Sequence, residues 1–257
     1  MTQEERLDFL IDYLQAEYTQ ISKPESFTRK RALLRGLVNI RPPRPVSQEF
    51  IRIQDEFLQE ETHQKGIVNI TDIPPCRPES PLCLWQGDIT RLALDAIVNA
   101  ANSRLLGCFV SGHGCIDNAI HTFAGVQLRQ ACSDLMQVQG HDEATGLAKI
   151  TAAYNLPSRY VLHTVGPIVR GALAQKYRAE LASCYRSCLA LAAEHGLTSI
   201  AFCCISTGEF RFPQQEAAET AVKTVTEFLS PGSSIQRVVF NVFKDDDYVI
   251  YRGLLGA

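Results

Sequence analysis

Two cysteines and a histidine gather in one short segment of the chain and could bind a metal ion. Cys108, His113 and Cys115 lie among glycines within residues 107–115. Two thiolates and an imidazole form a borderline-soft donor set that suits Zn²⁺, although this spacing is not that of a zinc finger. Three protein ligands leave one position for water or substrate, as catalytic zinc sites do. The residues alone leave three interpretations open: a metal site, incidental loop residues, or a reactive thiol.

Three further segments, each following an apolar run, are suited to a nucleotide-like ligand. They are Gly87–Thr90, the stretch from Asn99 to Asp117, and Ser206–Phe210. Glycines and small hydroxyl residues at the start of a helix let backbone N–H groups converge on phosphate oxygens without any net positive charge. One such loop predicts no more than a turn, but two of them together predict a diphosphate site.

These segments must be positioned by a sheet with helices on both of its faces. Short apolar runs predict strands at Leu82–Gln86, Ala96–Ala100, Leu147–Ala153, Tyr160–Val165, Ser199–Ile205 and Arg237–Phe243. Helical periodicity predicts helices at Ile116–Met136, Leu173–His195 and Pro213–Leu229. Strands that alternate with helices predict an α/β fold with a mainly parallel or mixed sheet, in which ligands bind at the carboxyl ends of the strands.

Residues 1–70 are predicted to form a helical extension. Its three helices are expected to start at Thr2, Ser26 and Ser47. Glu5 completes a capping box at the first helix, and the second helix is expected to end at Ile40, before a proline-rich stretch. We interpret the extension as a cap on the main domain, residues 80–257. The alternative is that the extension also lines a substrate site or binds a partner.

Composition excludes several classes of partner. The chain has 257 residues, of which 46% are apolar, with a formal net charge of −3 and 9 cysteines. Such a chain can bury a core without disulfides, and its odd cysteine count favours free thiols, metal ligands or reactive cysteines. The net charge gives no field that would attract nucleic acid. Because no long apolar run occurs and the first residues are acidic, we expect a cytoplasmic protein without a membrane partner.

Other catalytic motifs are incomplete or missing. His141 and Glu143 match the H-x-E half of a zinc deaminase, but the P-C-x-x-C half does not follow. Neither H-E-x-x-H nor the P-loop pattern occurs in the sequence. Deaminase, metalloprotease and P-loop NTPase functions therefore lose support.

Taken together, the motifs resemble those of the macrodomain family. The matching strings are Gly87-Asp88-Ile89-Thr90, Ala96-Ile97-Val98-Asn99-Ala100-Ala101-Asn102, Gly114-Cys115-Ile116-Asp117-Asn118-Ala119-Ile120-His121, and Ile205-Ser206-Thr207-Gly208 with Pro213. The resemblance covers residues 80–252. It implies a three-layer α/β/α fold with a mixed central sheet and ADP-ribose as the ligand. The form of the second and third strings is most similar to the branch that hydrolyses ADP-ribose from proteins.

The resemblance implies roles for individual residues. Asp88 is expected to accept a hydrogen bond from the adenine amino group, with the backbone of Ile89 beside it. Asn102 would orient the distal ribose, and Asp117 would lie near that ribose and the attacking water. The other expected ligand-binding residues are Gly112, Gly114 and Ile116 in the first phosphate loop and Ser206, Thr207, Gly208, Glu209 and Phe210 in the second.

Four more residues receive narrower interpretations. Phe243 and Tyr248 are the candidates for stacking on the adenine. Asn99 is interpreted as a brace of its loop, and His121 as a hydrogen-bonded core histidine rather than a catalyst. Five other cysteines are interpreted as small core residues: Cys132, Cys184, Cys188, Cys203 and Cys204. Cys76 and Cys83 flank a loop, and nothing local completes a ligand set for them.

The segment 107–115 departs from most of the family, whose members have a nearly pure glycine run there. In this departure, and in the helical extension, the chain resembles the zinc-containing macrodomains of bacteria and some fungi. That resemblance implies Zn²⁺ on Cys108, His113 and Cys115, facing the distal ribose. It implies an enzyme that removes mono-ADP-ribose from an ADP-ribosylated protein, with an Asp or Glu ester as the expected bond. A modified carrier protein is the implied substrate.

Two rival functions remain open at this point. The first is a reader module that binds ADP-ribose without hydrolysing it; Asn102 and Asp117 argue against it. The second is a metal- or redox-sensing interaction protein in which the thiols carry the function. An ADP-ribose release assay separates the hydrolase from the reader, and failure to bind ADP-ribose would favour the sensor.

Overall fold

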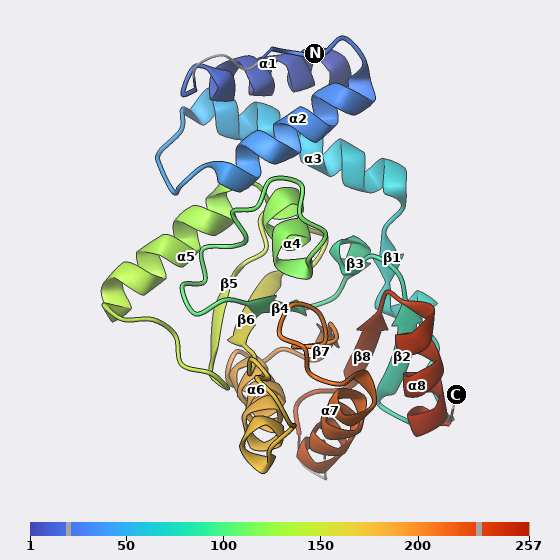
Figure 1. Ribbon diagram of the computed structural model, residues 1–257. Coiled ribbons are helices and arrows are strands. Elements are labelled where there is room, and N and C mark those ends of the chain that lie inside the picture. The colour runs from blue at the N-terminus through green and yellow to red at the C-terminus, as the bar shows by residue number, and fades with distance from the viewer. Residues whose placement is uncertain (19–21, 230–232, 257) are drawn as a thin grey trace.

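The main domain is built on a mixed sheet. The computed structural model describes residues 1–18, 22–229 and 233–256, and within them a six-stranded sheet has the strand order β2-β8-β7-β4-β6-β5 (Figure 1). Neighbouring strands are parallel except for β5, which is antiparallel to β6. The strands are β2 Leu82–Gln86, β4 Ala96–Ala101, β5 Ala148–Ala152, β6 Tyr160–Val165, β7 Ser199–Phe202 and β8 Arg237–Val242. The predicted α/β class, the mixed sheet and the existence of each predicted strand are confirmed.

Helices cover both faces of the sheet. Helices α4 and α5 lie on the face toward the N-terminal extension, and α6, α7 and α8 lie on the other (Figure 1). Their bounds are α4 Ile116–Ala124, α5 Val126–Gln139, α6 Gln175–Glu194, α7 Gln214–Phe228 and α8 Asp245–Leu255. Central strands such as β4 are almost wholly buried because helices cover them on both sides, which is why they read as continuous apolar runs.

The helix predicted over Ile116–Met136 is in fact two helices. Gly125 separates them with a φ of 93°, a left-handed conformation that favours glycine. Gln54 of α3 (Gln48–Lys65) then caps the second helix, since its Oε1 accepts a hydrogen bond of 3.0 Å from Val126 N. The apolar periodicity continues across the break, so periodicity alone could not reveal it.

Other boundaries also differ from the predictions. Strand β7 ends at Phe202 rather than Ile205, because the chain turns there into the Ser206–Phe210 loop. Helix α8 was not predicted; its first turn carries aspartates, which favour a helix N-terminus. A short pair of parallel strands, β1 Val68–Asn69 and β3 Leu92–Ala93, was not predicted either.

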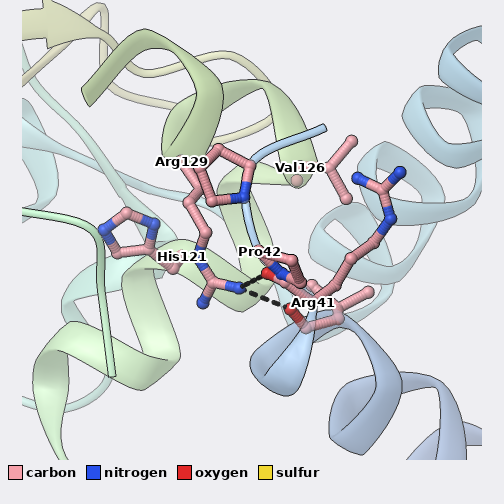
Figure 2. A pocket seen from close by; sticks show the side chains of 8 residues that line it. Arg41, Pro42, His121, Val126 and Arg129 are labelled. Atoms are coloured by element: carbon pink, nitrogen blue, oxygen red, sulfur yellow. Dashed lines mark hydrogen bonds between the residues drawn. The ribbon is translucent and has the colours of Figure 1, made fainter. Parts of the chain in front are cut away.

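The extension is a separate layer of helices that rests on α4 and α5 (Figure 1). It consists of α1 Gln3–Gln15, α2 Phe27–Ile40 and α3 Gln48–Lys65. The predicted capping box of Thr2 and Glu5 is present. These helices bury an apolar cluster of their own, which includes Leu10, Leu37 and Phe57. Where the extension meets α5, the guanidinium of Arg129 donates hydrogen bonds to backbone carbonyls at the end of α2 (Figure 2).

No helix in the described part of the chain is long and apolar enough to cross a bilayer.

Candidate functional site

The three predicted ligand loops meet at one edge of the sheet. Asp88 follows β2, Asn102 follows β4 and Ser206 lies beyond β7, and these strands run in the same direction. The carboxyl ends of parallel strands share one edge, where ligands bind in sheets of this kind. A direct contact joins two of the loops, since His113 Nε2 and Glu209 Oε1 lie 3.5 Å apart. The fold therefore brings together the segments that the sequence marked.

Asp117 is a buried carboxylate between two asparagines. Its Oδ1 accepts a hydrogen bond of 2.8 Å from Asn99 Nδ2, and its Oδ2 lies 3.4 Å from Asn102 Nδ2. Burial raises the pKa of Asp117 to about 6, and the hydrogen bond from Asn99 opposes that rise. Asn99 comes from β4 and Asp117 from the first turn of α4, so Asn99 links the strand to the helix after the loop, and its predicted part in bracing the loop stays a prediction.

A buried histidine in the neighbouring strand contacts Asn99, and no sequence motif predicts this contact. His163 of β6 is the register partner of Asn99, and its Nδ1 lies 3.2 Å from Asn99 Nδ2. Its Nε2 lies 2.9 Å from Thr151 Oγ1. Burial lowers the pKa of His163 to about 4, so the ring is neutral at neutral pH. The strand register alone creates this contact, and no local motif could have revealed it.

His121 lies in the core beneath Asp117. Its Nε2 is 3.5 Å from Asp117 Oδ1, and within the described residues neither ring nitrogen has a hydrogen-bond partner. Burial lowers its pKa well below the usual value. The core position predicted for His121 is confirmed, but the predicted hydrogen bond is absent from the described contacts. With Cys132 and His163 it forms a buried group of donor atoms; because Thr151 already engages His163, we assign this group to the core.

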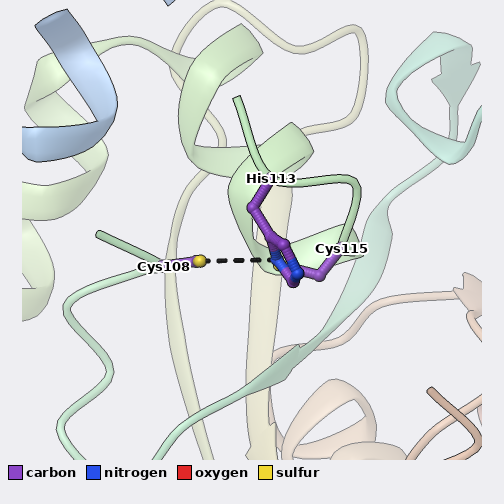
Figure 3. A group of neighbouring side chains, drawn as sticks. All are labelled: Cys108, His113 and Cys115. Carbon is purple, nitrogen blue, oxygen red and sulfur yellow. Dashed lines mark hydrogen bonds between the residues drawn. The ribbon is translucent and has the colours of Figure 1, made fainter. Parts of the chain in front are cut away.

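Cys108, His113 and Cys115 turn toward one another (Figure 3). Their ligand atoms all lie within 4.8 Å of one another. Cys108 Sγ and His113 Nδ1 are 3.6 Å apart, less than the sum of a Zn–S and a Zn–N bond, about 4.3 Å. Burial raises the pKa of Cys115 to about 12, and the neighbouring Cys108 adds to the rise. A divalent cation would have the opposite effect, because it stabilises the thiolate form of its cysteine ligands. The three converging ligand atoms therefore fit a metal ion.

The expected adenine-binding residues lie in a short turn after β2. Asp88 Oδ1 accepts hydrogen bonds from the backbone N and the hydroxyl of Thr90, at 3.0 and 2.7 Å. This cap forms a 3-10 turn, Ile89–Arg91, in which Ile89 is buried. Beyond β8, the two stacking candidates differ: Phe243 is 76% exposed and Tyr248 is half-buried.

The second phosphate loop has a constrained backbone. Ser206 has a φ of 66°, and its buried Oγ has no hydrogen-bond partner within the described residues. Thr207 Oγ1 donates to Cys204 O at 3.1 Å. Further along, the Gly208 carbonyl accepts from Arg211 N, and the Phe210 carbonyl accepts from Val169 N. The carbonyls on both sides of Glu209 are therefore fixed.

In the first phosphate loop, the glycines differ from each other. Gly112 has a φ of 66° and donates its N–H to Asn39 Oδ1 at 3.0 Å. That bond already uses the amide that was expected to face a phosphate. A side chain would meet nothing within 4 Å at either Gly112 or Gly114, but only Gly112 has a positive φ. Ile116 begins α4 and is half-buried.

Comparison with known proteins agrees with this arrangement. The family model for the Macro domain matches residues 98–221. A protein named protein-ADP-ribose hydrolase from Treponema medium is 54% identical over 260 aligned residues, which cover 99% of this chain and 100% of that protein. The chain belongs to the macro domain family. A protein-ADP-ribose hydrolase from Staphylococcus aureus is 48% identical to this macro domain protein and covers 97% of it, with 95% of the relative aligned.

A solved structure extends the likeness to three dimensions. The Trypanosoma brucei macrodomain in complex with ADP-ribose matches this macro domain protein with a TM-score of 0.68 and 33% identity. The match covers 91% of this chain and 97% of the other. The expectation of a macrodomain fold is therefore confirmed, with helices that precede the domain. The roles of the site residues and the identity of a bound metal stay predictions.

Proposed function

We propose that this macro domain protein hydrolyses the bond between ADP-ribose and a modified protein side chain. The single observation that carries the proposal is the placement of Asp117. Its carboxylate is buried at the ligand-binding edge of the sheet, between Asn99 and Asn102 and directly after the Cys108–Cys115 segment. The names of the full-length relatives support the same activity.

The chain's own residues would bind and orient the substrate. Backbone N–H groups of the loop before α4 and of the Ser206–Phe210 loop would hold the two phosphates. This anchoring would keep the distal ribose beside Asn102 and Asp117 at a high effective concentration. Asp88 and Ile89 would hold the adenine at the end of β2.

Asp117 would position the attacking water and accept its proton. Asn99 fixes Oδ1, so Oδ2 is the oxygen left to act, near the amide of Asn102. The water oxygen forms the new bond to the ribose, the bond from the ribose to the side-chain oxygen breaks, and the side chain leaves as a carboxylate. The proton lost by the water ends on Asp117 and returns to solvent. General-base catalysis of this kind contributes about 10²–10⁴-fold to a rate.

Cys108, His113 and Cys115 would hold the metal, and Zn²⁺ is the ion that best suits two sulfurs and one imidazole. When bound, such an ion supplies Lewis-acid polarisation of an oxygen close to it. The separation of Cys108 Sγ and His113 Nδ1 supports this assignment. Glu209 approaches His113 from the second phosphate loop and would orient its ring.

An ester to Asp or Glu is the proposed bond, because a carboxylate is a better leaving group than an amide or a guanidine. An ADP-ribosylated protein is thus the proposed partner, and a modified carrier protein is the form to test first.

The test measures free ADP-ribose released from two proteins, one modified on Asp or Glu and one modified on Arg. We expect rapid release from the ester and slow release from the arginine adduct. Binding of ADP-ribose without release from either would contradict the proposal and identify a reader module. Release from the arginine adduct alone would refute the ester preference.

A further inference from the structure

The N-terminal extension reaches directly into the loop that carries the predicted metal ligands. Arg35 of α2 donates from Nη2 to the backbone carbonyl of His113 at 2.9 Å. Its Nε and Nη2 also donate to Asn118 Oδ1, at 3.2 and 2.8 Å. The amide of Asn118 in turn donates to Val110 O at 3.0 Å. One guanidinium from the extension therefore fixes both the loop and the first turn of α4.

A second residue of α2 binds the same loop one helical turn later. Asn39 is fully buried, and its Oδ1 accepts the N–H of Gly112 at 3.0 Å. Its Nδ2 donates to Thr122 Oγ1 at 3.0 Å, and that hydroxyl donates to Asn118 O at 2.7 Å. Asn39 thus joins the loop to α4 through both ends of its amide group.

A third contact fastens the end of α2 to the start of the loop. Arg129 of α5 lies beside Arg41 at the end of α2 (Figure 2). It donates to the carbonyls of Val38, Asn39 and Arg41 and also to Leu106 O. Its guanidinium lies over the ring of Phe109, 4.4 Å from the centroid. Carbonyls at a helix C-terminus need such donors, and here one arginine serves the helix and the loop together.

The chemistry of this interface distinguishes it from a simple cap. The apolar cluster of the extension consists of its own side chains, and Val126 is the one contributor from the main domain among the described residues. The contacts to the loop are instead hydrogen bonds with fixed direction. Burial of apolar area is non-directional, so a hydrophobic cap alone would not fix the position of the loop. Hydrogen bonds have preferred distances and angles, so these bonds do fix it.

We propose that Arg35 and Asn39 are positioning residues of the site, which hold the segment 108–115 in the geometry that its ligands require. This inference rests on the proposed function for its catalytic readout. A loop rich in glycine loses much conformational entropy when it is ordered, and the extension supplies the bonds that offset this loss. Because a misplacement of about 1 Å at a reacting centre can cost about 10²-fold in rate, loosening the loop would lower kcat.

The experiment compares Arg35→Met and Asn39→Ala with a matched control, Lys30→Met. Lys30 lies on the same helix, but its ammonium pairs with Glu4 and Asp8 of the extension and not with the loop. Two quantities are measured in the full chain: the kcat and KM of ADP-ribose release, and amide hydrogen exchange in the peptide that spans residues 108–115. Arg35→Lys, which keeps the charge but lacks the planar fork, is the conservative variant.

We expect Arg35→Met and Asn39→Ala to lower kcat by about tenfold or more and to raise KM as well, because the same loop is proposed to hold a phosphate. Hydrogen exchange of the loop should become faster in both, while that of α1 stays slow. Lys30→Met should show the reverse, with faster exchange in α1 and unchanged kcat. Arg35→Lys should fall between the wild type and Arg35→Met in both readouts.

If the two loop variants match Lys30→Met in kcat and in loop exchange, the positioning role is refuted while the hydrolase stands. If the wild type releases no ADP-ribose, the proposed function fails, and the exchange measurement still decides whether α2 orders the loop. If Arg35→Met does not fold, Arg35→Lys and Asn39→Ala carry the same comparison.

Discussion

Asn99 Nδ2 lies 2.8 Å from Asp117 Oδ1, although one residue belongs to a central strand and the other to the helix that follows the ligand loop. The same amide group also lies 3.2 Å from His163 Nδ1. The sheet therefore holds the carboxylate through Asn99, while the backbone of Asp117 belongs to α4. A carboxylate bonded to a central strand is fixed in position, which suits the role proposed for Asp117, to position a water molecule.

Replacing Asp117 by Asn should abolish most of the turnover while the protein stays folded. The amide is the same size and can still accept from Asn99, but it cannot take a proton from water. We expect kcat to fall by about 10²–10⁴-fold with less than a tenfold change in ADP-ribose affinity. Release assays and calorimetry measure the two quantities. Equal losses in rate and affinity would instead indicate that the loop had collapsed.

Replacing Asn99 by Ala should destabilise the protein through Asp117. The change leaves a buried carboxylate oxygen without its donor, and we expect the free energy of unfolding to fall by about 1–3 kcal/mol. Urea denaturation measures this loss. In an Asp117→Asn background the loss should be smaller, because the charge that Asn99 stabilises is no longer there. Additive effects in the double variant would contradict the coupling.

Removing the metal ligands should remove the metal and the activity together. We expect about one zinc ion per wild-type chain, and much less after Cys108→Ser or Cys115→Ser. Cys76→Ser is the matched control, since Cys76 is a half-buried free cysteine outside the trio. Elemental analysis measures the zinc content, and ADP-ribose release before and after chelation measures the activity. Full activity in metal-free protein would refute the metal's part in the reaction.

Asp95 should make the fold sensitive to acid. Burial acts to raise its pKa, but hydrogen bonds from Thr198, Arg159 and Ser199 outweigh burial and lower the pKa to about 2. A folded-state pKa below the unfolded value of about 3.9 stabilises the protein above that pH, and this stability is lost as the pH falls toward 2. We expect a loss of at most about 2 kcal/mol over that range. Asp95→Asn should be less stable at pH 7 and should lack this part of the pH dependence.

The sequence predicted the sheet well because the inner strands β4, β6, β7 and β8 are buried on both faces. Strands Leu82–Gln86 and Tyr160–Val165 match the predicted bounds, and a glycine, Gly87 or Gly166, directly follows each of them. The break at Gly125 was invisible, because the apolar pattern of α4 continues in phase into α5. Gly125 is left-handed and lies against the side chain of Gln54 in α3, where a Cβ would clash. That contact is tertiary, so the local sequence does not predict it.

In the candidate site too, the residues of local motifs could be predicted and those placed by tertiary contacts could not. Asp117, Asn102 and the Cys108–Cys115 segment could be found because each belongs to a local motif. His163 could not, because it reaches Asn99 only through the pairing of β4 with β6. Arg35 and Asn39 were likewise hidden, since nothing in α2 indicates that the loop will lie against it.

Ser206 should show a trade between stability and binding. Its φ of 66° is unfavourable for a residue with a side chain, and its buried hydroxyl lacks a partner within the described residues. Each feature costs on the order of 1 kcal/mol or more. Ser206→Gly removes both costs and should raise the Tm, whereas Ser206→Ala keeps the strained backbone and should gain less. The same two variants test whether the hydroxyl of Ser206 binds a phosphate oxygen of ADP-ribose. A hydrogen bond to a charged group contributes about 1.5–3 kcal/mol, so we expect both variants to bind ADP-ribose about tenfold or more weakly by calorimetry. Unchanged affinity in both would mean that the backbone of this loop, and not the hydroxyl of Ser206, makes the contact.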